Sequence, residues 1–204
     1  MTGQQTIEVL LFDLGGILVD FAGFRELAPL LDETTTTESI HEKWIRSDAI
    51  RRFESGKITA ETCAQLFVTE WRLSLTPEEF LRQFSEWSRG LYPGTTRLLR
   101  RLQRTHRIAC LSNSNEVHGP SQRRWLDGLV DSFFFSYEMG VAKPDSAIFD
   151  LTIQSLEVPA SRIAYFDDTP VNVKAAAEAG MSAFHVTGLE ELTVTLRQLG
   201  VIAD

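Results

Sequence analysis

Five short apolar runs, separated by segments of helical periodicity, are the feature that most constrains the fold of this chain. Apolar runs of three to five residues are typical of buried strands, and their alternation with amphipathic helices is typical of a parallel sheet. The sequence therefore predicts an α/β fold with a doubly wound, Rossmann-like parallel sheet. The runs lie at residues 9–12, 108–111, 133–135, 163–166 and 182–186.

Residues 21–90 interrupt this alternation and carry helical patterns of their own. Because structureless loops of such length are uncommon in compact domains, we expect a small, all-helical cap domain here, inserted into a core of residues 1–20 and 91–204. Capping boxes predict helix starts near Ser39 and, with Pro77 in the first helical position, at Thr76. Gly56 is expected to break the first long helix. The aromatic residues of this segment are expected to form the interior of the cap.

The composition limits the classes of partner. The chain has 204 residues and a formal net charge of −8, which argues against nucleic acid or an anionic membrane as the partner. No apolar stretch reaches membrane-spanning length, and the first residues lack the pattern of a signal peptide. Cys63 and Cys110 lie in apolar segments, where buried free thiols are common. We therefore expect a cytoplasmic protein, with a local site for a small anionic substrate still open.

Three carboxylates follow predicted strands. Asp13 comes directly after the first apolar run, and Asp167 and Asp168 follow the run at residues 163–166. The carboxyl ends of parallel strands meet at one edge of a sheet, and carboxylates gathered there need a cation or a proton. For each aspartate alone, a turn or helix-cap role is the common alternative.

Two further elements reach the same edge: Ser112-Asn113 after the second predicted strand, and Lys143-Pro144 in a loop. The four elements, in this order, resemble the four motifs of the haloacid dehalogenase superfamily, in the phosphatase-like branch with a helical cap after the first strand. The resemblance covers nearly the whole chain. The most specific stretches are residues 11–16, 111–115, 140–145 and 166–172.

The resemblance implies a role for each residue. Asp13 would be the nucleophile that forms an aspartyl phosphate, and Lys143 would neutralise charge in the transition state. Ser112, Asn113 and Lys143 would bind the phosphoryl group. Magnesium would be held by Asp13, Asp168 and the backbone carbonyl of Gly15, with Asp167 as a second ligand or as a partner of the ligands. Taken singly, Ser112 could cap a helix and Lys143 could be a solvated loop residue.

Gly15 departs from the family pattern. Related phosphatases usually carry there a second aspartate that protonates the leaving alcohol and activates water. Positioned proton transfer contributes about a hundredfold to ten-thousandfold in rate, so we expect slower hydrolysis. Some sugar-phosphate phosphatases of the family share a similar Asp-Leu-Gly-Gly motif. Candidate substitutes are Asp20, His41 and His118, although a lone loop histidine is more often structural.

The sequence thus predicts a Mg²⁺-dependent phosphomonoesterase, a hydrolase acting on a small phosphorylated metabolite such as a sugar phosphate. One alternative is a 2-haloacid dehalogenase, although two adjacent acids suit a metal site better. The other is a catalytically impaired protein that binds phosphorylated ligands, for which Gly15 is the main support. Arg46, Arg51 and Arg52 are candidate substrate contacts, with a solvated helix face as the alternative. The sequence leaves the oligomeric state open.

Overall fold

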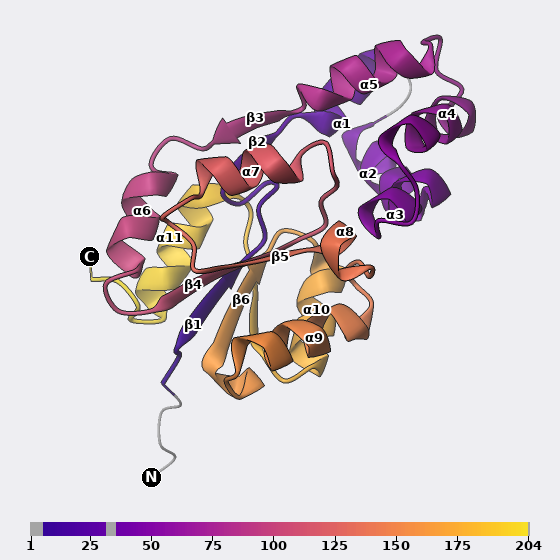
Figure 1. Cartoon of the computed structure of the whole chain (residues 1–204). Coiled ribbons are helices and arrows are strands. Elements are labelled where there is room, and N and C mark those ends of the chain that lie inside the picture. Colours follow the sequence, from indigo (N-terminus) through magenta and orange to yellow (C-terminus); the bar gives the residue numbers. More distant parts are fainter. Residues whose placement is uncertain (1–5, 32–35, 204) are drawn as a thin grey trace.

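The computed structural model describes residues 6–31 and 36–203. Its core is a five-stranded parallel sheet with the order β5-β4-β1-β6-β7 (Figure 1). All five predicted strands are present, so the predicted α/β architecture is confirmed. The strands are β1 (Val9–Phe12), β4 (Arg107–Ser112), β5 (Ser132–Phe135), β6 (Ile163–Asp167) and β7 (Ser182–His185).

The central strand β1 is fully buried because helices cover both faces of the sheet. Leu10 and Phe12 belong to one apolar cluster, and Val9 and Leu11 belong to another on the opposite face. Burying one such side chain stabilises the fold by about 1.5–3 kcal/mol, so β1 is a strong anchor for the residue that follows it. Helices α6 (Thr95–Leu102) and α11 (Gly188–Gln198) contribute to the first cluster, and α9 (Ser146–Leu156) and α10 (Pro170–Glu178) to the second.

Shorter helices complete the sheet domain: α7 (Gly119–Trp125), α8 (Ser136–Met139) and the 3-10 helix η2 (Ala160–Arg162). Cys110 lies in the core beside β1, and Cys63 lies among the helices of the inserted segment. Both are buried free thiols, as predicted. Within the part of the chain that the structure describes, no helix has the length and apolar character needed to cross a membrane.

The inserted segment is helical, as predicted, and lies to one side of the sheet (Figure 1). Its interior is a network of aromatic rings in which Phe67 and Phe80 stack with centroids 4.6 Å apart, and Trp44 contacts both Phe67 and Phe84. The prediction that these aromatics form an interior is confirmed. The helices are α1 (Gly23–Leu27), the 3-10 helix η1 (Ala28–Leu30), α2 (Thr37–Arg46), α3 (Asp48–Glu54), α4 (Ala60–Trp71) and α5 (Pro77–Ser85).

The capping box at Thr76 is confirmed, and the helix predicted to begin near Ser39 begins at Thr37. The cap of α2 is Thr36, whose hydroxyl accepts from the Ser39 amide at 3.2 Å, because an earlier start puts another turn before the buried Ile40. The helical stretch ends just before Gly56, as predicted, but it is also broken at Ser47, which the sequence did not predict. Ser47 ends α2 and its hydroxyl accepts from the Ile50 amide at 3.3 Å, so it caps α3.

The structure also contains a ribbon that the sequence did not predict. Strands β2 (Val19–Phe21) and β3 (Ser88–Leu91) pair in antiparallel orientation, and the Ala22 amide continues the pairing by donating to the Trp87 carbonyl at 2.7 Å. Both passages of the chain between the sheet and the helices run through this ribbon (Figure 1).

Candidate active site

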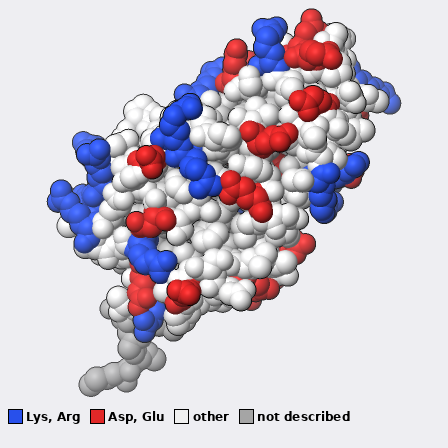
Figure 2. Space-filling model, viewed as in Figure 1, with Lys and Arg blue, Asp and Glu red and all other residues white. Residues whose placement is uncertain are grey.

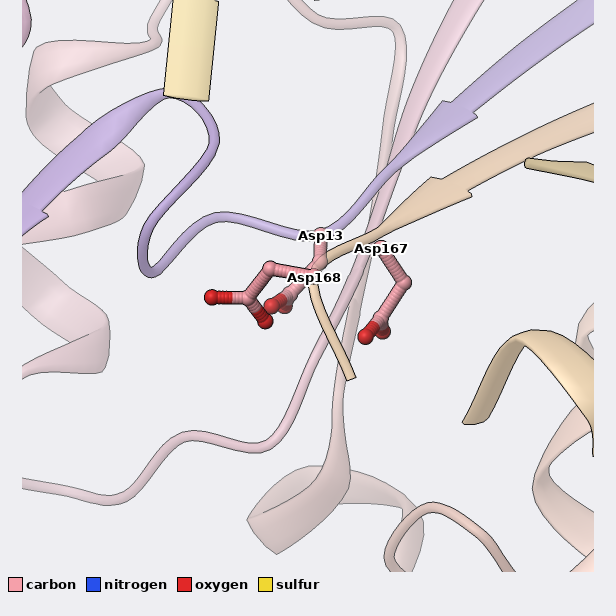
Figure 3. Close-up of side chains that lie close together, drawn as sticks. All are labelled: Asp13, Asp167 and Asp168. Carbon is pink, nitrogen blue, oxygen red and sulfur yellow. The ribbon is translucent and has the colours of Figure 1, made fainter. Parts of the chain in front are cut away.

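Three carboxylates converge where β1 and β6 end (Figure 3). Asp13 follows β1, Asp167 is the last residue of β6 and Asp168 comes next; each offers an oxygen within 4.8 Å of the others. The parallel register places them together, because Phe12 pairs with Phe166 directly before the acids. The predicted meeting of the three acids at one sheet edge is therefore what the structure shows.

Lys143 lies beneath these acids with a side chain only 1% exposed. Its ammonium group contacts Asp13 at 3.0 Å and Asp167 at 2.7 Å, and it donates to the Leu111 carbonyl at 3.0 Å. Burial alone would lower the pKa of Lys143, but the two carboxylates raise it above its ordinary value. Lys143 is thus a fixed cation whose three N–H donors are all engaged.

Asp167 is fully buried and surrounded by donors. Its oxygens accept from the Tyr165 hydroxyl, from the Thr169 amide at 2.7 Å and from the Asn172 amide group at 3.1 Å. Burial would raise the pKa of Asp167, but Lys143 and these hydrogen bonds hold it below its ordinary value. With its lone pairs occupied in this way, Asp167 is suited to orienting Lys143 and less suited to direct metal coordination.

Asp13 and Asp168 are the more open carboxylates. Burial raises the pKa of Asp13, Lys143 opposes the rise, and Asp167 and Asp168 add to it. Burial and the charge of Asp167 raise the pKa of Asp168, whose Oδ1 accepts from the Thr169 hydroxyl at 3.2 Å. A cation stabilises the charged forms of two neighbouring acids whose pKa values are raised.

The two glycines after Asp13 differ in what they permit. Gly16 has φ +73°, and a Cβ there would lie 2.2 Å from Oδ2 of Asp168, so any side chain would displace that carboxylate. A Cβ on Gly15 would meet only Cβ of Phe21, at an ordinary 3.7 Å. The lack of an acid at Gly15 is therefore not imposed by space at its Cβ.

Ser112 is the last residue of β4, and Asn113 follows it in the loop. The Asn113 side chain donates to the Lys143 carbonyl at 3.0 Å and accepts from the Lys143 amide at 2.8 Å, so it positions Lys143. Ser112 lines the cavity, and its hydroxyl has no hydrogen-bond partner among residues 6–31 and 36–203. It is the hydroxyl best placed to donate to a bound anion.

A cavity of about 930 Å³ lies over these residues, between the sheet edge and the helices. Asp13, Gly15, Ser112, Lys143 and Asp168 form its floor. The helical segment lines it with rings, aliphatic side chains and charged groups: Phe21, Phe24, Trp44, Ile45, Ile50, Phe84, His41, Arg46, Arg51, Glu54 and Lys57. Figure 2 shows acidic and basic side chains interspersed on one face, without a continuous basic surface there.

The candidate substitutes for the missing acid are placed differently. Asp20 pairs with Arg25 at 2.6 Å and does not line the cavity. His41 lines the cavity with its ring edge-on to Phe24. Of the predicted arginine contacts, Arg46 and Arg51 line the cavity, whereas Arg52 does not and pairs with Asp48 on the surface at 3.5 Å.

His118 connects the sheet domain to the helices. It is 3% exposed, its Nε2 bonds the Phe84 carbonyl at 2.7 Å, and its ring packs on that of Phe84. Burial lowers the pKa of His118 to about 4, and the hydrogen bond to Phe84 only partly opposes this. A neutral imidazole held in this way is structural, which is the alternative that the sequence left open.

This burial predicts acid sensitivity. The pKa of His118 falls from 6.5 when unfolded to about 4 when folded, so its contribution is complete above 6.5 and is lost as the pH falls toward 4. Between about pH 7 and about pH 5, His118 should account for about 2 kcal/mol of lost unfolding free energy. Urea unfolding at both pH values should show that loss in the wild type and a correspondingly smaller one in His118→Gln. Equal losses in the two proteins would contradict the assignment.

The sequence did not predict the hydrogen-bond partners of Asp167, Tyr165 and Asn172, or the position of Glu54 in the cavity wall. Tyr165 precedes Asp167 by two positions, so strand periodicity puts both on the same face and could have indicated their contact. Asn172 is brought close by the first turn of α10. Glu54 also lines the cavity, but no local pattern distinguishes it from other helix-surface acids.

Comparison with known proteins places this site in a family. The chain is 26% identical over 200 residues to the sesquiterpene phosphatase astK of Aspergillus oryzae, covering 95% of this chain and 97% of that protein. It is 25% identical over 208 residues to a D-ribitol-5-phosphate phosphatase of Bacteroides thetaiotaomicron, covering 93% and 98%.

A solved structure shares the fold. A haloacid dehalogenase family enzyme from Bacteroides thetaiotaomicron, crystallised with magnesium, superposes with a TM-score of 0.75 at 21% identity, covering 94% of this chain and 98% of that one. The sequence pattern of the haloacid dehalogenase-like hydrolase family matches residues 7–180, which include Asp13, Asp167 and Asp168. The chain therefore belongs to the haloacid dehalogenase-like hydrolases.

Proposed function

We propose that this hydrolase is a Mg²⁺-dependent phosphomonoesterase that acts on a small phosphorylated metabolite. The observation that carries the proposal is the position of Asp13, a carboxylate at the floor of the cavity, flanked by the open carboxylate of Asp168 and the fixed ammonium of Lys143. The phosphatase names of the two curated relatives support it.

The donor set fits magnesium. Asp13 and Asp168 present carboxylate oxygens with raised pKa values, and the hard oxygen ligands favoured by Mg²⁺ are the only kind that these acids offer. We propose that Asp13, Asp168 and the Gly15 carbonyl hold the ion, with Asp167 acting through Lys143. When bound, Mg²⁺ supplies charge that offsets the repulsion between a carboxylate and a phosphoryl group. A second structure of the Bacteroides enzyme contains both magnesium and inorganic phosphate.

The other steps of hydrolysis are assigned to side chains on the cavity floor. Asp13 attacks phosphorus as the ester P–O bond breaks and the alcohol leaves, which gives an aspartyl phosphate. Water then hydrolyses this intermediate to inorganic phosphate and frees Asp13. Lys143 stays in place because Asp167 and the Asn113 side chain fix it, so its charge is already oriented when the transition state forms. The Ser112 hydroxyl donates a hydrogen bond to a phosphoryl oxygen.

The helical segment, residues 21–90, is proposed as the cap that selects the substrate. Some of its aromatic residues, such as Phe24 and Trp44, line the same cavity as its charged residues Arg46, Arg51 and Lys57. This lining suits an organic group that carries both apolar and hydroxyl surface. A sugar or polyol phosphate is the proposed substrate class.

Phosphate release tests the proposal. With Mg²⁺, the protein should release phosphate from members of a panel of sugar and nucleoside phosphates. A chelator should reduce release to background because nothing else offsets the negative charge of Asp13 and Asp168, and added Mg²⁺ should restore it. Release that is insensitive to chelation would contradict the metal assignment.

A second candidate, a ligand-binding protein that hydrolyses too slowly to matter, is favoured by Gly15. It predicts a raised melting temperature with phosphorylated metabolites and no phosphate release. Chloride release from 2-haloacids without added metal would instead support a dehalogenase.

A further inference from the structure

Expulsion of an alkoxide requires a proton donor that the sheet edge does not provide. The leaving oxygen of an alkyl phosphate is a strong base and needs a proton as the P–O bond breaks. Lys143 has all three N–H groups engaged, and Nε2 of His118 is bonded to the Phe84 carbonyl. Gly15 has no side chain. The donor must therefore come from another wall of the cavity.

Glu54 is the acid on the opposite wall. It is the last residue of α3, lines the cavity that contains Asp13 and is half-buried. Burial raises the pKa of Glu54 to about 8, Lys143 and a hydrogen bond from Trp44 oppose the rise, and the Asp13 charge adds to it. No cation forms an ion pair with Glu54 in the part of the chain that the structure describes. At neutral pH this carboxyl group therefore holds a proton.

The backbone around Glu54 is fixed against the sheet domain. Gly56 has φ +64°, and a Cβ there would lie 2.3 Å from the Tyr137 carbonyl oxygen, so the end of α3 approaches α8 more closely than any side chain would permit. Four residues later, the Ala60 amide donates to Glu116 at 2.7 Å. These contacts hold Glu54 at the junction of the helices and the sheet domain.

Other charged groups share this space. His41 is the remaining group of the cap that could donate a proton, and its charge acts on Asp168. The cations do not exchange protons readily near neutral pH. The other charged groups that line the cavity are His41 and Arg46 from α2, Arg51 from α3, Lys57 after α3, and Asp13, Lys143, Asp145 and Asp168 from the sheet domain.

We propose, on the basis of the phosphatase function proposed above, that Glu54 is the general acid and base that replaces the side chain absent at Gly15. As Asp13 forms its bond to phosphorus, the electron pair of the breaking P–O bond goes to the leaving oxygen, which takes the proton of Glu54 and departs as an alcohol. The Glu54 carboxylate then accepts a proton from the water that attacks the aspartyl phosphate. Inorganic phosphate leaves, and Asp13 and protonated Glu54 are regenerated.

Two substrates with different leaving groups test the role. The full-length protein with Mg²⁺ is given an alkyl phosphate and p-nitrophenyl phosphate, whose leaving group needs no protonation. Glu54→Gln should lower kcat for the alkyl phosphate by about a hundredfold to ten-thousandfold. With p-nitrophenyl phosphate it should give a burst of nitrophenolate, about one equivalent per active site, followed by slow turnover, because only hydrolysis of the aspartyl phosphate lacks its base. Glu61→Gln, on the exposed side of α4, is the matched control and should behave as the wild type.

The contrary outcomes are distinct. A merely structural role for Glu54 predicts equal losses on both substrates and no burst, which would overturn the proposal. It would also be overturned if Glu54→Gln kept wild-type kcat on the alkyl phosphate, or if His41→Gln alone produced the burst. Absence of phosphate release by the wild type would instead refute the phosphatase function itself, and the role of Glu54 with it.

Discussion

Replacing Asp13 with asparagine is expected to lower phosphate release by a factor on the order of 10⁴ or more, because the variant lacks the nucleophile that forms the covalent intermediate. An amide oxygen is a poor nucleophile, and nothing else on the cavity floor can take its place: Asp167 is saturated with hydrogen bonds, and Asp168 is proposed to hold the metal. The measurement is the initial rate of phosphate release with saturating Mg²⁺.

The same substitution should leave the fold intact. Asp13→Asn removes one of three clustered negative charges, and Lys143 would keep its partner Asp167 at 2.7 Å. The melting temperature should therefore stay at or above that of the wild type. If Asp13→Asn is inactive but folded, its loss of phosphate release results from the missing nucleophile and not from unfolding. If Asp13→Asn kept more than about one hundredth of wild-type activity, a covalent route through Asp13 would be excluded.

Replacing Lys143 with methionine should have the largest effect on stability. The lysine neutralises Asp13 and Asp167 in a site where its own side chain is 1% exposed and that of Asp167 is 0% exposed. Removing one partner of a buried ionic cluster typically costs about 3–5 kcal/mol, because the remaining charges lose their compensation. Urea unfolding in the presence of a chelator measures this loss without a contribution from bound metal.

A paired variant separates charge from packing. Adding Asp167→Asn to Lys143→Met removes the uncompensated anion, so the double variant should recover part of the lost unfolding free energy. Phosphate release should be impaired in both, since neither has the cation at the transition state. If the free energy of unfolding of Lys143→Met lay within about 1 kcal/mol of that of the wild type, the ionic cluster would not be a main source of stability at this edge of the sheet.

The sequence predicted the sheet edge well because strand ends are local signals. Asp13, Asp167 and Asp168 follow apolar runs directly, and parallel pairing then brings those ends together. The roles of these residues, and the boundaries of residues 21–90 as a domain, stay predictions.

Features that depend on contacts distant in the sequence could not be predicted in this way. β2 has only three residues, too few for a period of two, and its partner β3 contains Gly90 and polar residues. The direction of the Glu54 side chain depends on where α3 begins, and the sequence pattern does not indicate the start at Ser47. Its position also depends on the close approach of Gly56 to Tyr137, which no pattern within α3 contains.

The β2–β3 ribbon has a consequence for how this architecture can change. The chain leaves the sheet domain on β2 and returns on β3, and these two strands are paired. The inserted helices therefore form a loop whose two ends lie side by side. Doubling the length of a flexible loop raises the entropic cost of closing it by only about 0.6 kcal/mol. A longer or shorter helical segment would therefore cost the sheet domain little stability. New helices joined at the same two strands would leave the spacing between Asp13 and Asp168 undisturbed. Exchanging the helices at the ribbon would thus change the residues that contact the substrate while keeping Asp13 and Asp168 in place. Because Glu54 belongs to the exchanged helices, a hybrid protein must carry an equivalent acid on its new helices to keep proton transfer.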